Sequence, residues 1–527
     1  MIHHFLENSA SRFPDKVAVI HEKARATYGQ INADADRLAA FLVNRGVSIG
    51  DRVVIVLENG IGYITAYYAV LKVGAVAVPL STDLKPDGLN PILAELEPAA
   101  IISSARFERL LQVSNLTVPN LRTMVIHNPK LDWTEIFSGA FSFEETTNHK
   151  PQTTNYLDQP STNSQFSPTE LGNIIYTSGS TGKPKGVMLS HGNIVANVDS
   201  ICRYQCLNED DVQMVVLPFF YVMGKSLLNT IFAVGGTLVV NNKFAFPATV
   251  VSQMIDEKVT VFSGVPSTFA YLLHRSPLKK SREHLKHLRL VTQAGGHMAR
   301  SLKKALREVL PNHTQICIMY GATEASARLT WLDPEWFDRK IDSIGRAIPE
   351  VSVKIFDDKG REVVQGEKGE VVASGANIMQ GYWKNPTSTA RVLDDNGYHT
   401  GDIGWQDAEG FIFLDGRKDN LLKVGGHRIN PQEIEDALLT TELAVEASVV
   451  GIADELLGYK LSALVVPVNG DCAPEAIMKQ CALLLPKYKL PSEIRLTRAL
   501  PKNANGKIDR NRCLDIFTAE PQRTQRE

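Results

Sequence analysis

The chain has 527 residues, which is too long for one hydrophobic core, so we expect at least two domains. Hydrophobic residues make up 44% and charged residues 22%, a composition typical of a soluble globular protein. The 56 Lys and Arg residues nearly balance the 58 Asp and Glu residues, and the resulting net charge of -2 disfavours nucleic-acid binding and attachment to anionic membranes.

The first residues, MIHHFLENSASRFPDK, have no cationic start followed by an apolar core, so we expect no signal peptide. The longest apolar stretch, residues 64–80, contains Lys72 and Gly74 and is too broken to span a bilayer. The six cysteines form no CxxC pair. This usage predicts reduced thiols in a cytoplasmic protein.

The first part of the chain alternates helices with buried strands. Thr27 is a candidate N-cap, because the apolar residues after it recur at helical spacing. Residues 51–59 and 75–80 read as buried strands on either side of a helix over residues 63–74, and residues 212–321 repeat the alternation. This order predicts parallel sheets covered by helices.

The pattern of predicted secondary structure changes in the last third of the chain. Residues 351–416 hold short alternating stretches cut by glycine turns, which predict a small antiparallel β region. Short strands and helices in an α+β pattern follow. One of these helices is expected to begin at Asn430, with Glu433 as its capping-box partner. Residues 144–169, rich in Thr, Asn, Gln, Ser and Pro, are expected to form a long surface loop.

The stretch IIYTSGSTGKPKGVMLSH, residues 174–191, suggests a phosphate-binding loop. A Walker A loop is excluded, because Gly179 is followed five residues later by Pro184 rather than by glycine. Both flanks read as strands, so the loop is expected to join a β-hairpin and to offer hydroxyl and backbone N–H donors to a polyphosphate. The alternative is a flexible surface hairpin. The candidate ligands are Thr177, Ser178, Gly179, Ser180, Thr181, Gly182, Lys183 and Lys185.

Four further motifs follow in order. YGATEA starts at Tyr320, which could stack on a purine, and contains Glu324, which could hold Mg²⁺. YHTGDIGW contains Asp402, which could accept hydrogen bonds from both hydroxyls of a ribose. GRKDNLLKVGGHRINPQEIE starts at Gly416, and NANGKIDR contains Lys507. Each motif is weak alone, but five in this order make coincidence implausible.

In these motifs the sequence resembles the adenylate-forming superfamily, which comprises acyl-CoA synthetases, beetle luciferases and the adenylation domains of nonribosomal peptide synthetases. The likeness covers essentially the whole chain. It implies a large N-terminal domain, residues 1–418, with two α/β subdomains over about residues 1–345 and a small antiparallel β-barrel over about residues 346–418. A small mobile α+β C-terminal domain, residues 419–527, would follow.

The resemblance also implies a reaction in two halves. A carboxylate attacks the α-phosphorus of ATP and pyrophosphate leaves; a thiol then attacks the acyl-adenylate and AMP leaves. The first half needs no general base, because a carboxylate is already ionised at neutral pH, but it needs neutralised charge and alignment. Lys507 matches the family lysine that bridges the carboxylate and the phosphate. Glu324 and Thr177 are the other candidate catalytic residues.

ATP and Mg²⁺ are the implied cofactors. Glu324 and Thr181 would support Mg²⁺, and the hairpin loop from Thr177 to Lys185 would hold the departing phosphates. Thr323 would contact the α-phosphate, and Asp402 with Arg417 would hold the ribose. The remaining nucleotide contacts implied by the family motifs, several of them around the adenine, are Gln293, Ala294, Gly295, Gly296, Tyr320, Gly321 and Ala322.

Two further sites follow from the resemblance. Asp419 matches the hinge about which the small domain rotates, and Gly425 and Gly426 match a loop that lines the tunnel for the thiol. The implied substrate pocket is lined by Phe220, Tyr221, Gly224, Lys225, Ser263, Gly264, Gly295 and Tyr320.

The substrate is harder to predict. The pocket stretch LPFFYVMGKS has no acid to anchor an α-amine, and Tyr221 stands where many acyl-CoA synthetases have histidine. Together with TQAGG and TEASARLTWLDP, this stretch most resembles stand-alone L-prolyl–carrier-protein ligases of pyrrole or anatoxin-type pathways. We therefore expect L-proline as substrate and a phosphopantetheinylated carrier protein as partner. The amine would then rely on uncharged acceptors such as Ser263, Gln293 or backbone carbonyls.

Three alternatives stay open: a fatty or aryl acid activated for CoA, another small amino acid, and a non-catalytic nucleotide-binding protein on the same fold. The intact Lys507, Glu324 and Asp402 disfavour the last of these. We expect no nucleic-acid or membrane partner, and either a monomer or a homodimer.

Overall fold

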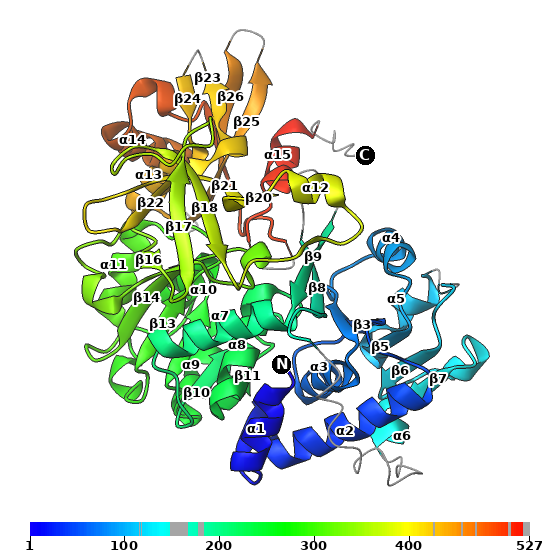
Figure 1. The fold of residues 1–527 in the computed structure, drawn as a ribbon. Helices are drawn as coiled ribbons and strands as arrows, with labels where there is room; N and C mark the ends of the chain where they lie inside the picture. The colour runs from blue at the N-terminus through cyan, green and yellow to red at the C-terminus, as the bar shows by residue number, and fades with distance from the viewer. Residues whose placement is uncertain are drawn as a thin grey trace, which may run out of the picture.

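The structure, a computed structural model, describes residues 1–114, 116, 118–147, 167–177, 184–424, 427–454, 457–468, 472–503 and 507–519. Two large sheets with helices lie side by side, and a smaller antiparallel sheet lies above them (Figure 1). The C-terminal domain, orange to red, sits on top (Figure 1). This arrangement confirms the predicted fold class, with two α/β subdomains, a small antiparallel β region and a small α+β C-terminal domain; the β region is a curled half-barrel where a barrel was predicted.

The first large sheet has nine strands among the described residues, and its central strands run parallel. In sheet order they are β16 (Arg346–Ala347), β15 (Thr330–Leu332), β14 (Gln315–Tyr320), β13 (Leu290–Gln293), β12 (Val261–Gly264), β10 (Val212–Val215), β11 (Thr237–Val240), β1 (Val17–His21) and β2 (Ala24–Thr27). The helices that connect them are α7 (His191–Tyr204), α8 (Val222–Val234), α9 (Pro247–Asp256), α10 (Pro266–Arg275) and α11 (Arg300–Val309).

The second large sheet has eight strands in the described chain. In sheet order they are β19 (Gly381–Tyr382), β9 (Lys185–Ser190), β8 (Leu171–Thr177), β4 (Val76–Pro79), β3 (Arg52–Val56), β5 (Ala100–Ser104), β6 (Thr123–His127) and β7 (Ala140–Ser142). Its helices are α1 (His4–Arg12), α2 (Tyr28–Asn44), α3 (Ile61–Val73), α4 (Pro86–Leu96), α5 (Glu108–Gln112) and α6 (Phe143–Thr147).

One hydrophobic core joins the two large sheets through the helices between them. The core includes Ile55 of one sheet, Val240 of the other, and residues of α1, α2, α3, α7 and α8. Helix α2 begins as the sequence predicts, because the Thr27 hydroxyl accepts a hydrogen bond from the backbone N–H of Gln30 in a capping box. The buried faces of α3 and α8 therefore meet in the middle of the molecule.

The smaller sheet is antiparallel, as the sequence predicts. Its strands are β17 (Val351–Phe356), β18 (Gly369–Gly375), β20 (Leu393–Asp394), β21 (Gly397–Gln406) and β22 (Ile412–Arg417), with α12 (Pro386–Ala390) before β20. Because β21 pairs with β22, Asp402 of β21 and Arg417 of β22 lie opposite each other in the ladder.

The C-terminal domain packs α-helices on a mixed sheet. Its elements are β23 (Leu422–Val424), β24 (His427–Ile429), α13 (Pro431–Thr440), β25 (Ala444–Asp454), β26 (Gly458–Pro467), α14 (Pro474–Leu484), β27 (Glu493–Leu496) and α15 (Arg510–Thr518). Asn430 caps α13 through the N–H of Gln432. The predicted capping box is wrong, because the Glu433 carboxylate instead pairs with Lys489 Nζ at 2.6 Å.

The two parts of the chain meet through a docking face of α10 and α11 on one side and α13 and β25 on the other. His297 Nε2 lies 2.9 Å from the Asp436 carboxylate, and the Tyr271 hydroxyl donates to Glu446 at 3.5 Å. Ala270 adds a small apolar contact with the core of the C-terminal domain. The docking face is thus mostly polar.

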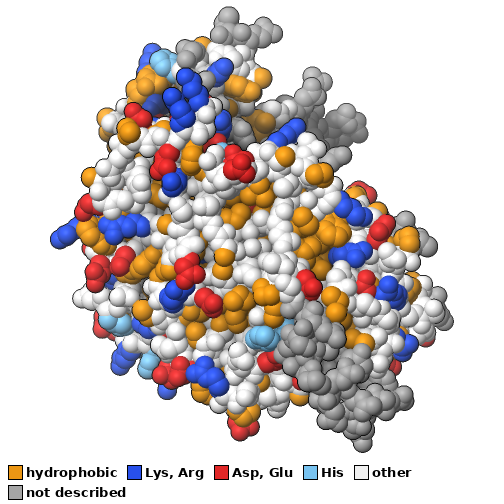
Figure 2. All heavy atoms as spheres, in the orientation of Figure 1, with side chains coloured by type: hydrophobic (Ala, Val, Ile, Leu, Met, Phe, Trp, Pro, Cys, Tyr) orange, Lys and Arg blue, Asp and Glu red, His pale blue; other side chains and the backbone are white. Residues whose placement is uncertain are grey.

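Among the described residues, no helix is both long and apolar enough to cross a bilayer. The six cysteines are free thiols, as predicted. Figure 2 shows acidic and basic side chains interspersed on the face drawn there, with hydrophobic side chains near its middle. This mixed surface fits the small net charge.

Candidate active site

Three of the predicted motifs meet at one edge of the nine-stranded sheet. Strands β12, β13 and β14 are parallel neighbours, so their carboxyl ends lie side by side. They carry Gly264, Gln293 and Tyr320 at their last positions, and the glycine-rich segments that follow extend from the same edge. The carboxyl edge of a parallel sheet is the usual place for ligands in α/β folds.

Tyr320 and Asp402 come from different sheets and are joined by a hydrogen bond. The Tyr320 hydroxyl donates to Asp402 Oδ2 at 2.5 Å, and Arg417 Nη1 lies 3.7 Å from Asp402 Oδ1. Burial raises the pKa of Asp402, although Arg417, Tyr320 and Lys507 all lower it. The carboxylate is therefore fixed with its charge partly balanced, as a ribose-binding group requires. Its predicted role stays a prediction.

Glu324 has a partner that the sequence did not reveal. The Tyr382 hydroxyl donates to Glu324 Oε1 at 2.8 Å, and Lys185 Nζ lies 5.0 Å from the centre of the Tyr382 ring. Tyr382 therefore contacts both Glu324, the predicted Mg²⁺ ligand, and Lys185 of the hairpin. The only local signal for this residue was an aromatic side chain after a glycine, which is too common to single out.

The hairpin itself is confirmed. Strands β8 and β9 pair antiparallel with Thr177 opposite Lys185, so the loop leaves the sheet beside Tyr382. The structure does not describe the predicted phosphate ligands Ser178, Gly179, Ser180, Thr181, Gly182 and Lys183. The phosphate role of the loop and the role of Thr181 toward Mg²⁺ therefore stay predictions.

The predicted acyl segment lies close to the glycines after β13. Gly295 has φ +85°, and a Cβ atom there would meet Val265 Cγ1 at 3.0 Å and Tyr221 Oη at 3.1 Å. Glycine is therefore required for both conformation and space. The other predicted residues on these segments are Phe220, Gly224, Lys225, Ala294, Gly296, Gly321, Ala322 and Thr323.

Lys507 reaches this region from the C-terminal domain. Its Nζ lies 5.6 Å from the centre of the Tyr221 ring, and its charge acts on Asp402. Of the residues that the sequence assigned to the acyl group and the nucleotide, Tyr221 and Asp402 thus lie near a lysine from the other domain. The role of Lys507 in adenylation stays a prediction.

Of the uncharged acceptors predicted for a substrate amine, Ser263 is already engaged. Ser263 is fully buried, and its hydroxyl lies 2.7 Å from Thr292 Oγ1 and accepts from Gln213 Nε2 at 3.3 Å. Gln293 is also buried, and its Nε2 donates to the Gly296 carbonyl at 2.9 Å. The described structure thus gives little support to Ser263 as an amine anchor.

The predicted hinge and tunnel are only partly described. Asp419 lies in a short 3₁₀ turn, Lys418–Asn420, directly after β22 and before β23. Gly425 and Gly426 lie outside the described residues. The roles of all three stay predictions.

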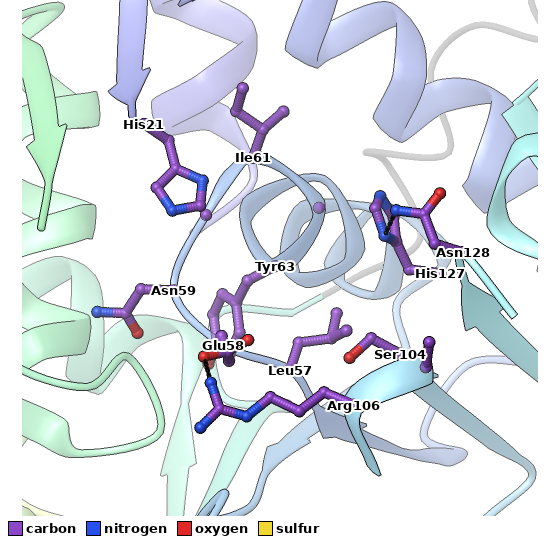
Figure 3. A pocket seen from close by; sticks show the side chains of 13 residues that line it. His21, Leu57, Glu58, Asn59, Ile61, Tyr63, Ser104, Arg106, His127 and Asn128 are labelled. Atoms are coloured by element: carbon purple, nitrogen blue, oxygen red, sulfur yellow. Dashed lines mark hydrogen bonds and ion pairs between the residues drawn. The ribbon is translucent and has the colours of Figure 1, made fainter. Parts of the chain in front are cut away.

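A crevice of about 430 Å³, lined by both polar and apolar side chains, lies on the other side of the acyl segment (Figure 3). Arg106 and Glu58 form an ion pair at this crevice. Asn59 and Tyr63 line it and also hold the acyl segment: Asn59 bonds to the Leu217 carbonyl and the Phe219 N–H, and the Tyr63 hydroxyl bonds to the Phe219 carbonyl. The crevice and the acyl segment therefore share a wall.

We expect Asp402→Ala to raise the KM for ATP about 10²-fold or more, since hydrogen bonds to a charged group contribute about 1.5–3 kcal/mol each and two would be lost. The measurement is pyrophosphate exchange at varied ATP, repeated with 2′-deoxy-ATP. Asp415→Ala, an exposed carboxylate on the adjacent strand, serves as the control. An unchanged preference of Asp402→Ala for ATP over 2′-deoxy-ATP would contradict the ribose assignment.

Comparisons with known proteins agree with this geometry. The chain matches the AMP-binding enzyme family over residues 6–383 and the AMP-binding enzyme C-terminal domain over residues 433–507. It is 30% identical to a long-chain-fatty-acid–CoA ligase of Bacillus subtilis (strain 168), covering 97% of this chain and 94% of that protein. It is also 30% identical to indoleacetate–CoA ligase of Aromatoleum aromaticum, covering 96% of each.

Two solved structures are also similar. The anthranilate CoA ligase AuaEII in complex with anthranoyl-AMP has a TM-score of 0.88 at 25% identity, over 98% of this chain and 96% of that one. o-Succinylbenzoate coenzyme A synthetase of Bacillus subtilis, in complex with ATP and a magnesium ion, has a TM-score of 0.79 at 26% identity, over 97% and 99%.

These relatives are CoA ligases, whereas the sequence motifs predicted a prolyl–carrier-protein ligase. The comparisons therefore support the assignment to ATP-dependent acid–thiol ligases. They do not support the narrower assignment to prolyl–carrier-protein ligases. By the match of both family domains, by its relatives and by its fold, the chain belongs to the adenylate-forming AMP-binding enzyme family of acid–thiol ligases.

Proposed function

We propose that this protein uses ATP and Mg²⁺ to activate a small carboxylic acid as an acyl-adenylate and then transfers the acyl group to the thiol of CoA. The observation that carries this proposal is the approach of Lys507 to Tyr221, opposite the Asp402–Tyr320 pair. Two of the relatives, with fatty-acid and indoleacetate substrates, use CoA by name, which supports CoA as the thiol.

The roles of the residues in adenylation follow from the charges of the substrate carboxylate and of the ATP phosphates. The substrate carboxylate needs no base, so the protein has to bring it to the α-phosphorus and offset the negative charge that gathers there. Lys507 supplies a cation at that point, and Lys185 supplies another toward the leaving phosphates. Asp402 and Arg417 would hold the ribose. Closing the C-terminal domain onto the site is what brings Lys507 into place.

The residues present fit a bound Mg²⁺. Glu324 Oε1 accepts from Tyr382, and the other carboxylate oxygen has no partner within the described part of the chain. A hard cation such as Mg²⁺ favours carboxylate oxygens together with phosphate oxygens. When bound, Mg²⁺ would neutralise charge on the leaving pyrophosphate, and Glu324 with Thr181 would hold it.

The alternative is transfer of L-proline to a carrier protein, which the sequence motifs favoured. The surroundings of Tyr221 argue against it, because the buried cation Arg328 interacts with Tyr221 and no described carboxylate pairs with that arginine. A protonated amine would gain no counter-charge in this place.

We therefore expect CoA to exceed a phosphopantetheinylated carrier as acceptor by about tenfold or more at equal concentration, which corresponds to about 1.4 kcal/mol. The measurement is thioester formation by the full chain with CoA or with a holo-carrier, using hexanoate, benzoate, succinate and L-proline in turn. The apo-carrier is the control. Faster loading of L-proline on the holo-carrier than of any acid on CoA would contradict the proposal.

A further inference from the structure

A strongly basic segment, residues 274–289, runs from the end of α10 to the start of β13. It holds six Lys or Arg residues and one acid, Glu283, so it carries a formal net charge of +5 in a chain whose net charge is -2. His274, His284 and His287 lie between these cations. Such a local excess of positive charge attracts anions, whatever the charge of the whole chain.

The basic segment is anchored to the core of the nine-stranded sheet. Leu278, Leu285 and Leu288 are each at most 3% exposed and pack in that core. Backbone hydrogen bonds close the turns between them, from the His284 N–H to the Ser281 carbonyl at 2.9 Å and from the Leu288 N–H to the Leu285 carbonyl at 3.2 Å. The cations are therefore displayed from an ordered scaffold.

A crevice of about 320 Å³, which we call the basic crevice, opens beside this segment. It is lined by Arg282, Glu283 and Lys286 of the basic segment and by Pro311, Asn312 and His313 of the loop before β14. The Arg282 guanidinium donates to the Asn312 side chain at 2.6 Å, so the two lining segments are joined. Sites for small molecules in proteins begin at about 300 Å³.

The basic crevice lies at the opposite edge of the sheet from the active site. Its two lining segments lead into β13 and β14, which pair in parallel with Leu290 opposite Gln315 (Figure 1). The Thr314 hydroxyl also donates to the Leu288 carbonyl at 2.7 Å. Gln293 and Tyr320, at the far ends of the same strands, belong to the active-site edge. The length of the strands therefore separates the basic crevice from the predicted nucleotide site.

The cations around the basic crevice have no carboxylate partner. Among the described residues, none of Lys279, Lys280, Arg282 and Lys286 forms an ion pair, and Glu283 pairs with none of them. Arg289, at the end of the same segment, by contrast bonds to the Asp211 carboxylate at 2.6 Å. The positive charge at the basic crevice is thus left for a group from outside the described chain.

A further cation lies next to the basic crevice. Arg307 of α11 donates to the carbonyls of Pro311 and Thr314, both at 2.5 Å. Burial lowers the pKa of Arg307; Asp338 raises it, and the charge of Arg282 lowers it. The two guanidinium groups are therefore close enough to repel each other beside an open crevice. A bound anion would relieve that repulsion.

We propose that the basic crevice is a binding site for a phosphate group, either free as phosphate or diphosphate or carried by a nucleotide. Arg282 offers a planar fork of N–H donors and Lys286 a compact ammonium, and both suit phosphate oxygens. The side chains of Asn312 and His313 add further donors. The site does not depend on the proposed function, although the reaction outlined above releases diphosphate.

The surroundings of the basic crevice fit a small anion better than a membrane or a nucleic acid. Among the described residues, no large hydrophobic side chain is exposed between Phe246 and Val364. Binding in a membrane interface needs apolar side chains that enter it, and single-stranded nucleic acids stack their bases on exposed aromatic rings. The lining residues instead surround a space of small-molecule size.

The test is amide hydrogen exchange of the full chain, with phosphate, diphosphate or AMP as the probe and succinate as the control anion. We expect residues 282–290 and 311–316 to exchange about tenfold more slowly when diphosphate is present at about ten times its Kd. Added salt should weaken this protection, because the crevice is exposed. Diphosphate also has a predicted place in the active site, so protection near Gln293 and Tyr320 is scored separately.

Charge variants separate binding from structure. Lys286→Gln and Arg282→Gln are each expected to weaken diphosphate binding by about 3- to 10-fold, whereas Glu283→Gln should strengthen it by about 2- to 5-fold, because it removes the acid at the crevice. Lys23→Gln, at an exposed lysine in the turn between β1 and β2, is the matched control and should leave binding unchanged. A structural defect would not move the two kinds of variant in opposite directions.

Stronger protection by phosphate or diphosphate than by AMP would identify the free anion as the ligand, and the reverse would identify a nucleotide; both results support the site. Equal protection by succinate would overturn the assignment to phosphate. Protection confined to the active-site edge, or unchanged in Lys286→Gln and Arg282→Gln, would overturn the proposal. So would the absence of protection by every probe, which would leave the basic segment as a solvated face or a contact for an acidic partner. The proposed function stands in each of these cases.

Discussion

Lys507→Ala is expected to lower the rate of pyrophosphate exchange by about 10²- to 10³-fold, as the loss of one well-placed electrostatic group usually does. The reason is that Lys507 is the cation that the C-terminal domain brings next to Tyr221. Formation of thioester from pre-formed acyl-adenylate should change far less, because that half needs no new charge at the α-phosphorus. Both half-reactions are measured separately in single turnovers.

Lys479→Ala, an exposed lysine on α14 of the same domain, is the matched control and should leave both half-reactions intact. An equal loss in both half-reactions of Lys507→Ala would show that the lysine serves folding or domain docking, and not adenylation.

The second large effect is on stability. Arg510 Nη2 donates to Glu435 Oε2 at 2.8 Å, and Glu435 is only 3% exposed. Burial raises the pKa of Glu435 even though Arg510 lowers it, so the pair does not fully offset the loss of solvent around the carboxylate. Arg510→Met leaves that carboxylate without its cation, which is expected to cost about 3–5 kcal/mol.

Hydrogen exchange of β25 measures this loss, because the N–H of Val449 in that strand donates to Glu435 at 2.7 Å. Protection of β25 should fall by about 10²- to 10⁴-fold in Arg510→Met. The double variant Glu435→Leu with Arg510→Met should recover most of it, because an apolar pair replaces a buried ion pair with little penalty. Protection that stays low in the double variant would point to packing and not to charge.

This pair also matters for the site. Arg510 opens α15, three residues after Lys507, and the bridge between Lys502 and Ile508 closes the turn that presents the lysine. Weakening the pair should therefore loosen the segment that carries Lys507, so the stability measurement bears on the first half-reaction as well.

Much of the fold follows from local sequence. Strand periodicity and glycine turns predicted the parallel strands, the β8–β9 hairpin and the antiparallel sheet, because these features depend on residues close together in the chain. The gathering of Gly264, Gln293 and Tyr320 at one sheet edge also follows once the strands are known to be parallel, although the order of the strands in the sheet does not.

The contacts that define the acyl region could not be predicted in this way. Lys225 meets Tyr63 across 162 residues, and Tyr382 meets Glu324 across 58. No periodicity links such residues, because the pairing depends on how α3 packs on α8 and how β19 adds to the eight-stranded sheet. Family motifs named Lys225 as a pocket residue, whereas its ammonium packs against Tyr63 and Tyr67 between α3 and α8.

The docking face between the two domains sets how firmly the closed arrangement is held. Its contact between His297 and Asp436 is exposed, and even a fully charged exposed pair stabilises by only about 0–1 kcal/mol and weakens with salt. The closed arrangement is therefore only shallowly favoured over those in which the small domain has turned away. If that domain serves both halves of the reaction, a shallow preference is useful, since a tightly held lid would keep the thiol from reaching the acyl-adenylate.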